Sequence, residues 1–250
     1  MQSTRTRLDR FIRARTGIHR RDIRSVLAQG RVTVDGQVAT GISQVIDQFS
    51  RVLLDNQLLQ ARTPTYVMLH KPAGVVSATS DEQHKTVIDL LDRPDRHSLH
   101  IAGRLDFNST GLLLLTNDGR WSRGLSAPEN EVGKRYRVSL ENPIGDDYIQ
   151  AFAQGLYFAY EGIMTRPAQL RVIDTHTAEI CLVEGRYHQI KRMFGRFDNP
   201  VIQLHRTAIG ELELDPTLLP GQSRDLTETE LKNLARQAKS APWPRVGRLL

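Results

Sequence analysis

The chain has little cysteine and no long apolar run. Its 250 residues include one cysteine, Cys181, so no internal disulfide can form. The apolar stretch AEICLV around it indicates a buried thiol in a reducing compartment. No stretch reaches the roughly 20 apolar residues that a transmembrane helix needs. The first 16 residues, MQSTRTRLDRFIRART, lack the apolar core of a secretory signal. We therefore expect a cytoplasmic protein that does not enter a membrane.

Motifs for several common chemistries are also missing from the sequence. The eight histidines and the single cysteine do not fall at the spacings of zinc ligands, so no metal site is predicted. A Walker loop, a dinucleotide-binding fingerprint and a G-x-S-x-G elbow are all absent. Nucleotide hydrolysis, hydride transfer and serine hydrolase chemistry are therefore not supported.

Lysine is missing from the first 31 residues, whereas arginine is abundant there. This segment contains nine arginines and two aspartates, which gives it a net charge of +7. The whole chain carries only +6. The nine arginines are Arg5, Arg7, Arg10, Arg13, Arg15, Arg20, Arg21, Arg24 and Arg31. A basic segment on a nearly neutral body indicates binding to a polyanion, and the forked guanidinium suits phosphate.

The N-terminal pattern predicts a small domain over residues 1–60. Apolar residues at helical spacing predict helices within 6–16 and 19–30, and the alternation around Asp35-Gly36 predicts a hairpin over 31–39. From about residue 5 to residue 60 the chain resembles the S4 RNA-binding domain, including RLDRFI and the GRVTVDG hairpin. The resemblance implies a module that docks on structured RNA, with contacts expected from Arg10, Arg20, Arg21 and Arg24.

A polar linker is expected at 61–65, followed by a second domain over 66–239 and a basic tail over 240–250. Strands outnumber helices and do not alternate with them, which predicts an α+β fold. The expected strands lie within 65–77, 98–106, 112–115, 133–143, 168–174 and 178–183, and the expected helices within 146–154, 185–197 and 228–239.

Two residues of the second domain are candidates for chemistry on their own pattern. Asp106 lies in GRLDFNSTGLLLLTNDG, on a loop before a buried leucine strand that would end at the Asn117-Asp118-Gly119 turn. Such loops present reactive groups, although many inert surface aspartates look the same. In the helix expected over 185–197, Lys191 lies on the flank of the apolar stripe, whereas Arg192 points away from it. Lys191 is therefore the better placed of the two to reach a cleft, although a solvated lysine fits the spacing too.

Nearly the whole chain resembles the RsuA-type pseudouridine synthases. The resemblance lies in HKPAGVVSATSD, AGRLDFNSTGLLLLTNDG, GKRYRVSL, EGRYHQIKRMF and LHRTAIG. It implies a mainly antiparallel catalytic sheet with flanking helices, and an isomerase that detaches uracil at N1 and rejoins it through C5 without cofactor or metal. By the same resemblance Asp106 is the nucleophile, Tyr136 stacks on the base, Lys191 pairs with the aspartate, and Arg104 fills the gap left by the displaced nucleotide.

The resemblance also implies an RNA substrate, although other functions stay open. EGRYHQIKRMF favours the small-subunit branch, hence 16S rRNA or an assembly intermediate of the small subunit, with a uridine at about position 516 as the substrate. Modification of 23S rRNA and a non-catalytic S4-domain assembly factor remain open. DNA and membranes are not expected partners, and a monomer is expected. The sequence around residues 198–200 lacks the glycine that the family commonly places before the asparagine.

Overall fold

The computed structural model describes residues 5–236. The chain divides between Pro64 and Thr65 into two compact units, each with its own hydrophobic core. The boundary falls within the stretch where the polar linker was expected, while strand β6 continues to Gln60.

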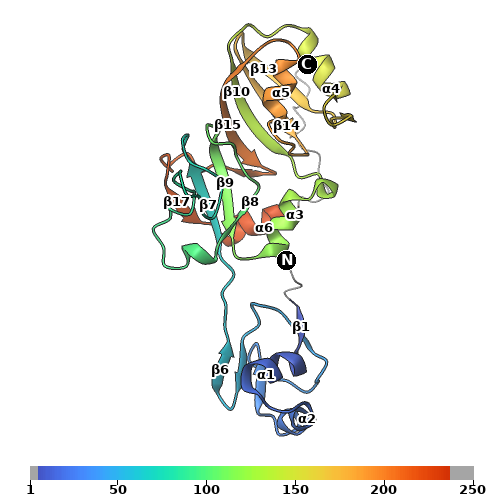
Figure 1. The fold of residues 1–250 in the computed structure, drawn as a ribbon, viewed down its shortest axis with the longest axis vertical. Helices are drawn as coiled ribbons and strands as arrows, with labels where there is room; N and C mark the ends of the chain where they lie inside the picture. The colour runs from blue at the N-terminus through green and yellow to red at the C-terminus, as the bar shows by residue number, and fades with distance from the viewer. Residues whose placement is uncertain (1–4, 237–250) are drawn as a thin grey trace. The chain divides into compact units, whose positions relative to one another are not determined.

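The N-terminal unit contains two helices that pack on each other beside a small sheet (Figure 1). Its elements are β1 (Thr6–Arg7), α1 (Leu8–Thr16), α2 (Arg20–Ala28), β2 (Val32–Val34), β3 (Gln37–Val38), β4 (Val45–Ile46), β5 (Val52–Leu54) and β6 (Gln57–Gln60). Strands β3, β2, β5 and β6 form one antiparallel sheet in that order, and β1 pairs with β4.

The local sequence explains these elements. Leu8, Ile12 and Ile23 are buried between the helices and the sheet because the apolar positions recur at helical spacing. Gly17 ends α1 with a φ of 75°, and the Asp35-Gly36 turn of the β2–β3 hairpin has positive φ at both residues. The two helices and the hairpin were predicted, whereas the strands β5 and β6 that complete the sheet were not.

The second unit is built on a nine-stranded mixed sheet, which confirms the expected α+β fold. Along the sheet the order is β13-β14-β10-β15-β9-β7-β17, with β16 beside β15 and β8 beside β9. Only the β9–β15 pair is parallel among the strand pairs of the described residues. The strands are β7 (Tyr66–Lys71), β8 (His100–Ala102), β9 (Thr110–Thr116), β10 (Lys134–Leu140), β13 (Gln169–Asp174), β14 (Thr177–Leu182), β15 (Val201–Ile209), β16 (Leu212–Glu213) and β17 (Ser223–Asp225).

Four consecutive leucines in β9 are buried because both faces of the sheet are covered at this point. Leu113 and Leu115 pack into a cluster with Val87 and Leu91, from the long connection between β7 and β8. On the opposite face, Leu112 and Leu114 belong to a second cluster that includes residues of α3 (Gly119–Ser126) and α6 (Glu228–Arg236). A strand covered on both faces reads as a continuous apolar run.

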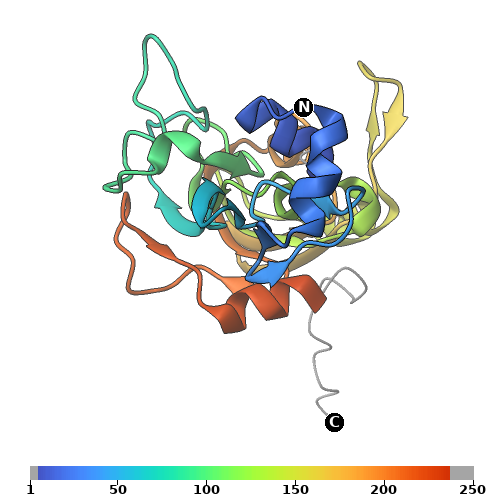
Figure 2. The same cartoon turned by 90° about the horizontal axis from the view of Figure 1, so that it is seen from below.

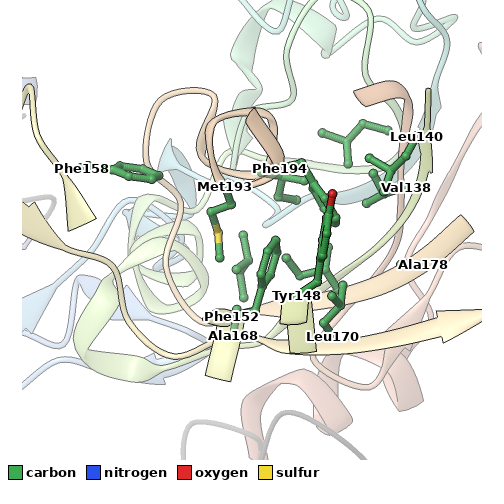
Figure 3. Packing of buried hydrophobic residues seen from close by; sticks show 14 residues of the cluster. Val138, Leu140, Tyr148, Phe152, Phe158, Ala168, Leu170, Ala178, Met193 and Phe194 are labelled. Carbon is green, nitrogen blue, oxygen red and sulfur yellow. The ribbon is translucent and has the colours of Figure 1, made fainter. Parts of the chain in front are cut away.

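A third cluster fills the space between β10, β14 and two helices, α4 (Asp147–Gln154) and α5 (Gln189–Gly195) (Figure 3). Its centre is aromatic, since Phe152 lies 4.9 Å from Phe194 between ring centroids and Tyr148 stacks on Phe197 at 4.0 Å. The cluster holds α5 against the sheet. A short hairpin, β11 (Tyr157–Phe158) and β12 (Ile163–Met164), projects from the rest of this unit (Figure 2).

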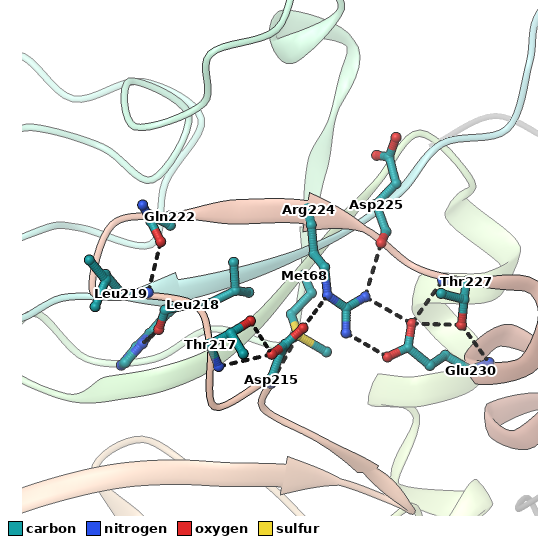
Figure 4. Close-up of polar contacts among 11 residues, drawn as sticks. Met68, Asp215, Thr217, Leu218, Leu219, Gln222, Arg224, Asp225, Thr227 and Glu230 are labelled. Carbon is teal, nitrogen blue, oxygen red and sulfur yellow. Dashed lines mark hydrogen bonds and ion pairs between the residues drawn. The ribbon is translucent and has the colours of Figure 1, made fainter.

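The C-terminal helix is fixed by a network centred on Arg224 (Figure 4). Its guanidinium donates to Asp215 at 2.7 Å and to both carboxylate oxygens of Glu230 at 2.7 and 2.9 Å. Glu230 and Thr227 also form the predicted capping box at the start of α6. Hydrogen bonds from Thr217 and then from Arg224 lower the pKa of Asp215 to about 2, and hydrogen bonds from Arg224 and then Thr227 lower that of Glu230 to about 2. The end of this helix near residue 239 and the tail over 240–250 lie outside the described residues.

One helix was not predicted, and the bounds of another were wrong. Asp118 does not lie in a simple turn; its side chain accepts hydrogen bonds from the backbone N–H groups of Arg120 and Trp121 and starts α3, which was not predicted. The expected helix over 185–197 forms only from Gln189 to Gly195. It begins late because His188 has a φ of 49°, which a right-handed helix cannot include.

The loop at 198–200 keeps the backbone conformation that glycine favours. Asp198 has a φ of 50°, which aspartate tolerates better than most residues. The neighbouring Asn199 is fully buried, accepts a hydrogen bond from the backbone N–H of Asn142 at 2.9 Å and donates to its carbonyl oxygen at 2.9 Å. The residue before Asn199 is therefore an aspartate in the left-handed region, a conformation that glycine adopts readily.

Candidate active site

The candidate site begins where β9 and β15 approach each other. Gly111 has a φ of 105°, and a Cβ atom there would lie 2.3 Å from the carbonyl oxygen of Arg206. Only glycine allows the two backbones to come so close. The residues just before Gly111 form the loop that carries Asp106, so this close approach places the loop beside β15.

Lys71 holds the backbone of the Asp106 loop. This lysine ends β7 and is fully buried, and its ammonium donates to the carbonyl oxygens of Asp106 at 3.0 Å, Phe107 at 3.1 Å and Ser109 at 2.8 Å. A fourth bond goes to the carbonyl oxygen of Pro72. Burial lowers the pKa of Lys71 to about 8, while the charge of Asp106 opposes this shift. Because three carbonyl oxygens of the loop accept hydrogen bonds from one ammonium group, the loop is held in place. This in turn sets the direction of the Asp106 side chain.

The carboxylate of Asp106 faces two basic side chains from the segment around α5. The distance from its Oδ2 atom to Nζ of Lys191 is 3.9 Å, and to Nε2 of His188 it is 3.7 Å. About a third of each side chain is exposed, so the site is open to a substrate. A carboxylate in such a position can act as a nucleophile.

Arg206 connects the loop, the sheet and Tyr136. Its buried guanidinium donates to the carbonyl oxygens of Leu112 at 2.7 Å and Gly103 at 2.9 Å. Longer contacts of 3.4 Å reach the carbonyl oxygen of Arg104 and the hydroxyl of Tyr136. One cation therefore sets the position of the tyrosine relative to the loop.

Tyr136 lies on β10 at the junction of two of the hydrophobic clusters. Its ring is partly exposed, and Arg206 fixes its hydroxyl. Arg104 differs from these buried groups, because its side chain is exposed and makes no hydrogen bond or ion pair with any residue from 5 to 236. The structure thus brings Asp106 and Lys191 together, joins Tyr136 to their loop through Arg206, and leaves Arg104 beside them with an available guanidinium.

Arg192 lies in a different environment from its neighbour Lys191. It forms a two-pronged ion pair with Glu161 on the β11–β12 hairpin, and its guanidinium carbon lies 3.8 Å from the ring centre of Phe158. These contacts tie the hairpin to α5. Arg192 therefore stabilises this part of the fold and does not face Asp106.

The arginines expected to bind RNA lie on the two helices of the N-terminal unit. Arg10, Arg20, Arg21 and Arg24 are all exposed. Arg10 and Arg20 line a cavity of about 130 Å³ together with Arg7, Asp9 and Arg13. Asp9 is nearly buried, and its hydrogen bonds to Arg7 are the main reason why its pKa is lowered.

Residues 5–236 contain no cluster of His, Cys, Asp and Glu that could hold a metal ion. No helix in that range is long and apolar enough to cross a membrane. Cys181 is buried in β14, as its apolar surroundings indicated, and burial raises the pKa of its thiol to about 11. The site itself combines a partly exposed carboxylate, two basic groups and a tyrosine, an arrangement suited to nucleophilic or acid–base catalysis.

Three residues of the site were not identified from sequence. Lys71, His188 and Arg206 all lie within the family motifs, in HKP, GRYHQ and LHR. Their roles depend on contacts with residues far away in the chain. Local periodicity carries no signal for such contacts.

Comparison with known proteins agrees with this geometry. A family model for RNA pseudouridylate synthase matches residues 65–195. The protein named ribosomal small subunit pseudouridine synthase A in Pseudomonas aeruginosa is 52% identical over 90% of this chain and 98% of its own length. The Escherichia coli (strain K12) protein of the same name is 41% identical, covering 91% of this chain and 99% of its own. A crystal structure described as a pseudouridylate synthase is 37% identical, with a TM-score of 0.67 over 91% of this chain and 99% of that one.

The fold and the site define an enzyme of the pseudouridine synthase type. The extent of these matches shows that the chain belongs to the RNA pseudouridylate synthase family.

Proposed function

We propose that this protein converts one uridine of 16S rRNA to pseudouridine, with Asp106 as the nucleophile. The observation that carries the proposal is the placement of Asp106, whose loop Lys71 fixes and whose carboxylate faces Lys191 at 3.9 Å. The small-subunit target is taken from the relatives, which are named for the small ribosomal subunit. By resemblance, the substrate is the uridine at about position 516.

The site fits a base that has been flipped out of the RNA. Flipping costs a few kcal/mol, which stacking and edge hydrogen bonds then offset. The ring of Tyr136 provides the stacking surface, and Arg206 keeps it in place. The exposed guanidinium of Arg104 is available to occupy the space that the nucleotide leaves. Asp106 then acts at C1′, at C6 of the base, or on the 2′ proton, three routes that share the same carboxylate.

The N-terminal unit, about residues 1–60, is proposed to bind rRNA in the manner of an S4 domain. Its exposed arginines Arg10, Arg20, Arg21 and Arg24 would contact phosphates, and the cavity beside Arg10 and Arg20 is lined by four arginines and one aspartate. Residues 66–239 would carry the chemistry. The enzyme would act on the rRNA or on an assembly intermediate in the cytoplasm.

A specific observation weighs against a non-catalytic assembly factor. Asp106, Lys191 and Tyr136 are all present, and buried cations hold the loop and the tyrosine in place. A binding protein would have no use for a carboxylate fixed beside an ammonium group in an open site.

The test of the target is to incubate the protein with 16S and 23S rRNA separately and to map pseudouridine by carbodiimide-blocked reverse transcription. We expect one new stop in 16S rRNA, at about position 516. A product found only in 23S rRNA would overturn the choice of target and leave the chemistry intact. The absence of product on both rRNAs and on small-subunit assembly intermediates would contradict the enzyme itself.

A further inference from the structure

His188 has an unusual backbone conformation for a non-glycine residue, in the turn over 186–189 that leads into α5. Its φ of 49° and ψ of 30° lie in the left-handed region, and it occupies the position just before α5. Strained residues of this kind collect at functional sites, where the surrounding structure enforces them. The contacts of the imidazole therefore bear on its function.

A buried polar pair enforces this conformation. Gln189 donates to Glu184 at 2.7 Å and accepts a hydrogen bond from the backbone N–H of Arg186 at 3.0 Å. Glu184 also accepts from the backbone N–H of Arg166 at 2.9 Å, and both Glu184 and Gln189 are almost fully buried. The segment that precedes α5 is therefore tied together at its two ends, at Glu184 and at Gln189, with His188 in the turn between them.

The imidazole points its edge toward the catalytic carboxylate. Nε2 of His188 lies 3.7 Å from Oδ2 of Asp106, a distance too long for a hydrogen bond. One face of the ring stacks on Tyr187, with centroids 3.9 Å apart and planes 17° apart. Neither ring nitrogen makes a hydrogen bond to any residue from 5 to 236. A neutral imidazole here has a nitrogen lone pair available beside the reacting centre.

The reaction has a proton step that Asp106 and Lys191 leave unassigned. When the detached uracil rejoins the ribose through C5, this carbon carries both its hydrogen and the new bond to C1′. The C5–H electron pair must then form the C5=C6 double bond, while the C6=N1 pair moves to N1, which takes a proton from water. A base near C1′ has to accept the C5 proton, and it later returns that proton to water.

We propose that His188 is this base and therefore a further catalytic residue, which rests on the function proposed above. Lys191 is a poor candidate because an ammonium group has no lone pair. Tyr136 is a poor candidate because a phenol hydroxyl is a far weaker base than an imidazole. Histidine is the side chain best suited to accept and release protons near neutral pH.

The test uses the full-length protein in excess over a 16S rRNA transcript that contains uridine with either hydrogen or deuterium at C5. His188→Asn removes the base and tolerates the left-handed backbone, and His188→Gly suits it and leaves space for added imidazole. His176→Asn is the control, because His176 lies on the exposed turn between β13 and β14. Melting temperature and rRNA affinity show whether each variant is folded and binds.

Both His188 variants should form pseudouridine about 100-fold more slowly than wild type or worse, since general bases contribute about 10²–10⁴-fold. The slow reaction should show a deuterium isotope effect, and imidazole should accelerate His188→Gly. Turnover close to wild type, or slow turnover without an isotope effect and without rescue, would overturn the role of His188. Wild-type protein that forms no product would instead overturn the proposed function, and this role with it.

Discussion

The two units of this protein use basic side chains in opposite ways. In the N-terminal unit, Arg20, Arg21 and Arg24 are exposed on a helix, and the core beneath them is complete without them. In the second unit, Lys71 and Arg206 are buried, and backbone carbonyls accept hydrogen bonds from both. Exposed cations remain available for a phosphate chain, whereas buried and fully bonded cations shape a site.

An enzyme that modifies RNA must both bind the RNA and position its catalytic groups, and the two units divide these tasks. Phosphate contacts supply affinity that depends on salt and carries little chemical selectivity. Positioning a nucleophile requires groups that do not move when the substrate arrives, and buried hydrogen bonds provide this rigidity. Variants in the two units should therefore fail in different ways, those of the first in binding and those of the second in rate.

The largest effect is expected for Asp106→Asn, which keeps the size of the side chain but removes its charge. Pseudouridine formation should fall at least about a thousandfold, which corresponds to about 4 kcal/mol of barrier. Affinity for rRNA should stay within about twofold, because every cation that binds phosphate is still present. Asp118→Asn is the matched control, since asparagine starts a helix as well as aspartate does. Comparable rates for the two variants would contradict the assigned nucleophile.

Lys191→Met should reduce the single-turnover rate by about 10- to 100-fold, because the cation 3.9 Å from Asp106 is removed. The neighbouring Arg192→Met serves as the control. It removes the ion pair with Glu161 and the contact with Phe158, so it should lower the melting temperature slightly and leave the rate nearly unchanged. If Lys191→Met and Arg192→Met lost rate equally, the proximity of Lys191 to Asp106 would not explain its effect on catalysis.

Replacing Arg20, Arg21 and Arg24 together by glutamine should weaken rRNA binding about tenfold at moderate salt. The slope of log affinity against log salt should become shallower by about 0.7–0.9 for each phosphate that is no longer neutralised. Replacement of the same three residues by lysine keeps the charge and should keep most of the slope. An unchanged slope in the glutamine variant would place the phosphate-binding residues elsewhere.

The smallest effect concerns stability at low pH. Because the pKa of Glu230 is lowered to about 2 in the folded protein, its contribution is complete above about pH 4.5 and is lost as the pH falls toward 2. Glu230→Gln should therefore lower the free energy of unfolding by about 1–2 kcal/mol at pH 6 and by less at pH 3. Glu228→Gln, on the exposed side of α6, is the control. Equal losses for Glu230→Gln at both pH values in urea titrations would contradict the role of the Arg224 network.

Much of the fold could be predicted because it follows from local patterns. Helical spacing predicted α1 and α2, alternation predicted β10, and the leucine run predicted β9. The helix α4 and the β13–β14 hairpin were also predicted. The start of α3 was missed because Asn-Asp-Gly is a turn signal as well as a capping signal. The late start of α5 depends on the pair of Glu184 and Gln189, whose effect on His188 appears only in three dimensions.

The candidate site was predicted less completely than the fold. Family motifs predicted roles for Asp106, Tyr136, Lys191 and Arg104, and helical geometry independently favoured Lys191 over Arg192. Lys71 and Arg206 could not be assigned, because a lysine in a strand pattern gives no sign that distant carbonyls will surround it. The role of such a buried cation can be recognised only in the folded structure, where the segments that it joins lie together.

The most direct test of the division between the two units is the single-turnover rate measured against protein concentration, with 16S rRNA as the substrate. The glutamine variant of Arg20, Arg21 and Arg24 should need more protein to reach half of its maximal rate, yet should reach the wild-type maximum. Asp106→Asn should show no measurable rate at any concentration, while binding the rRNA normally. A lowered maximum in the folded arginine variant, or a rate for Asp106→Asn that rises to the wild-type value, would contradict the account.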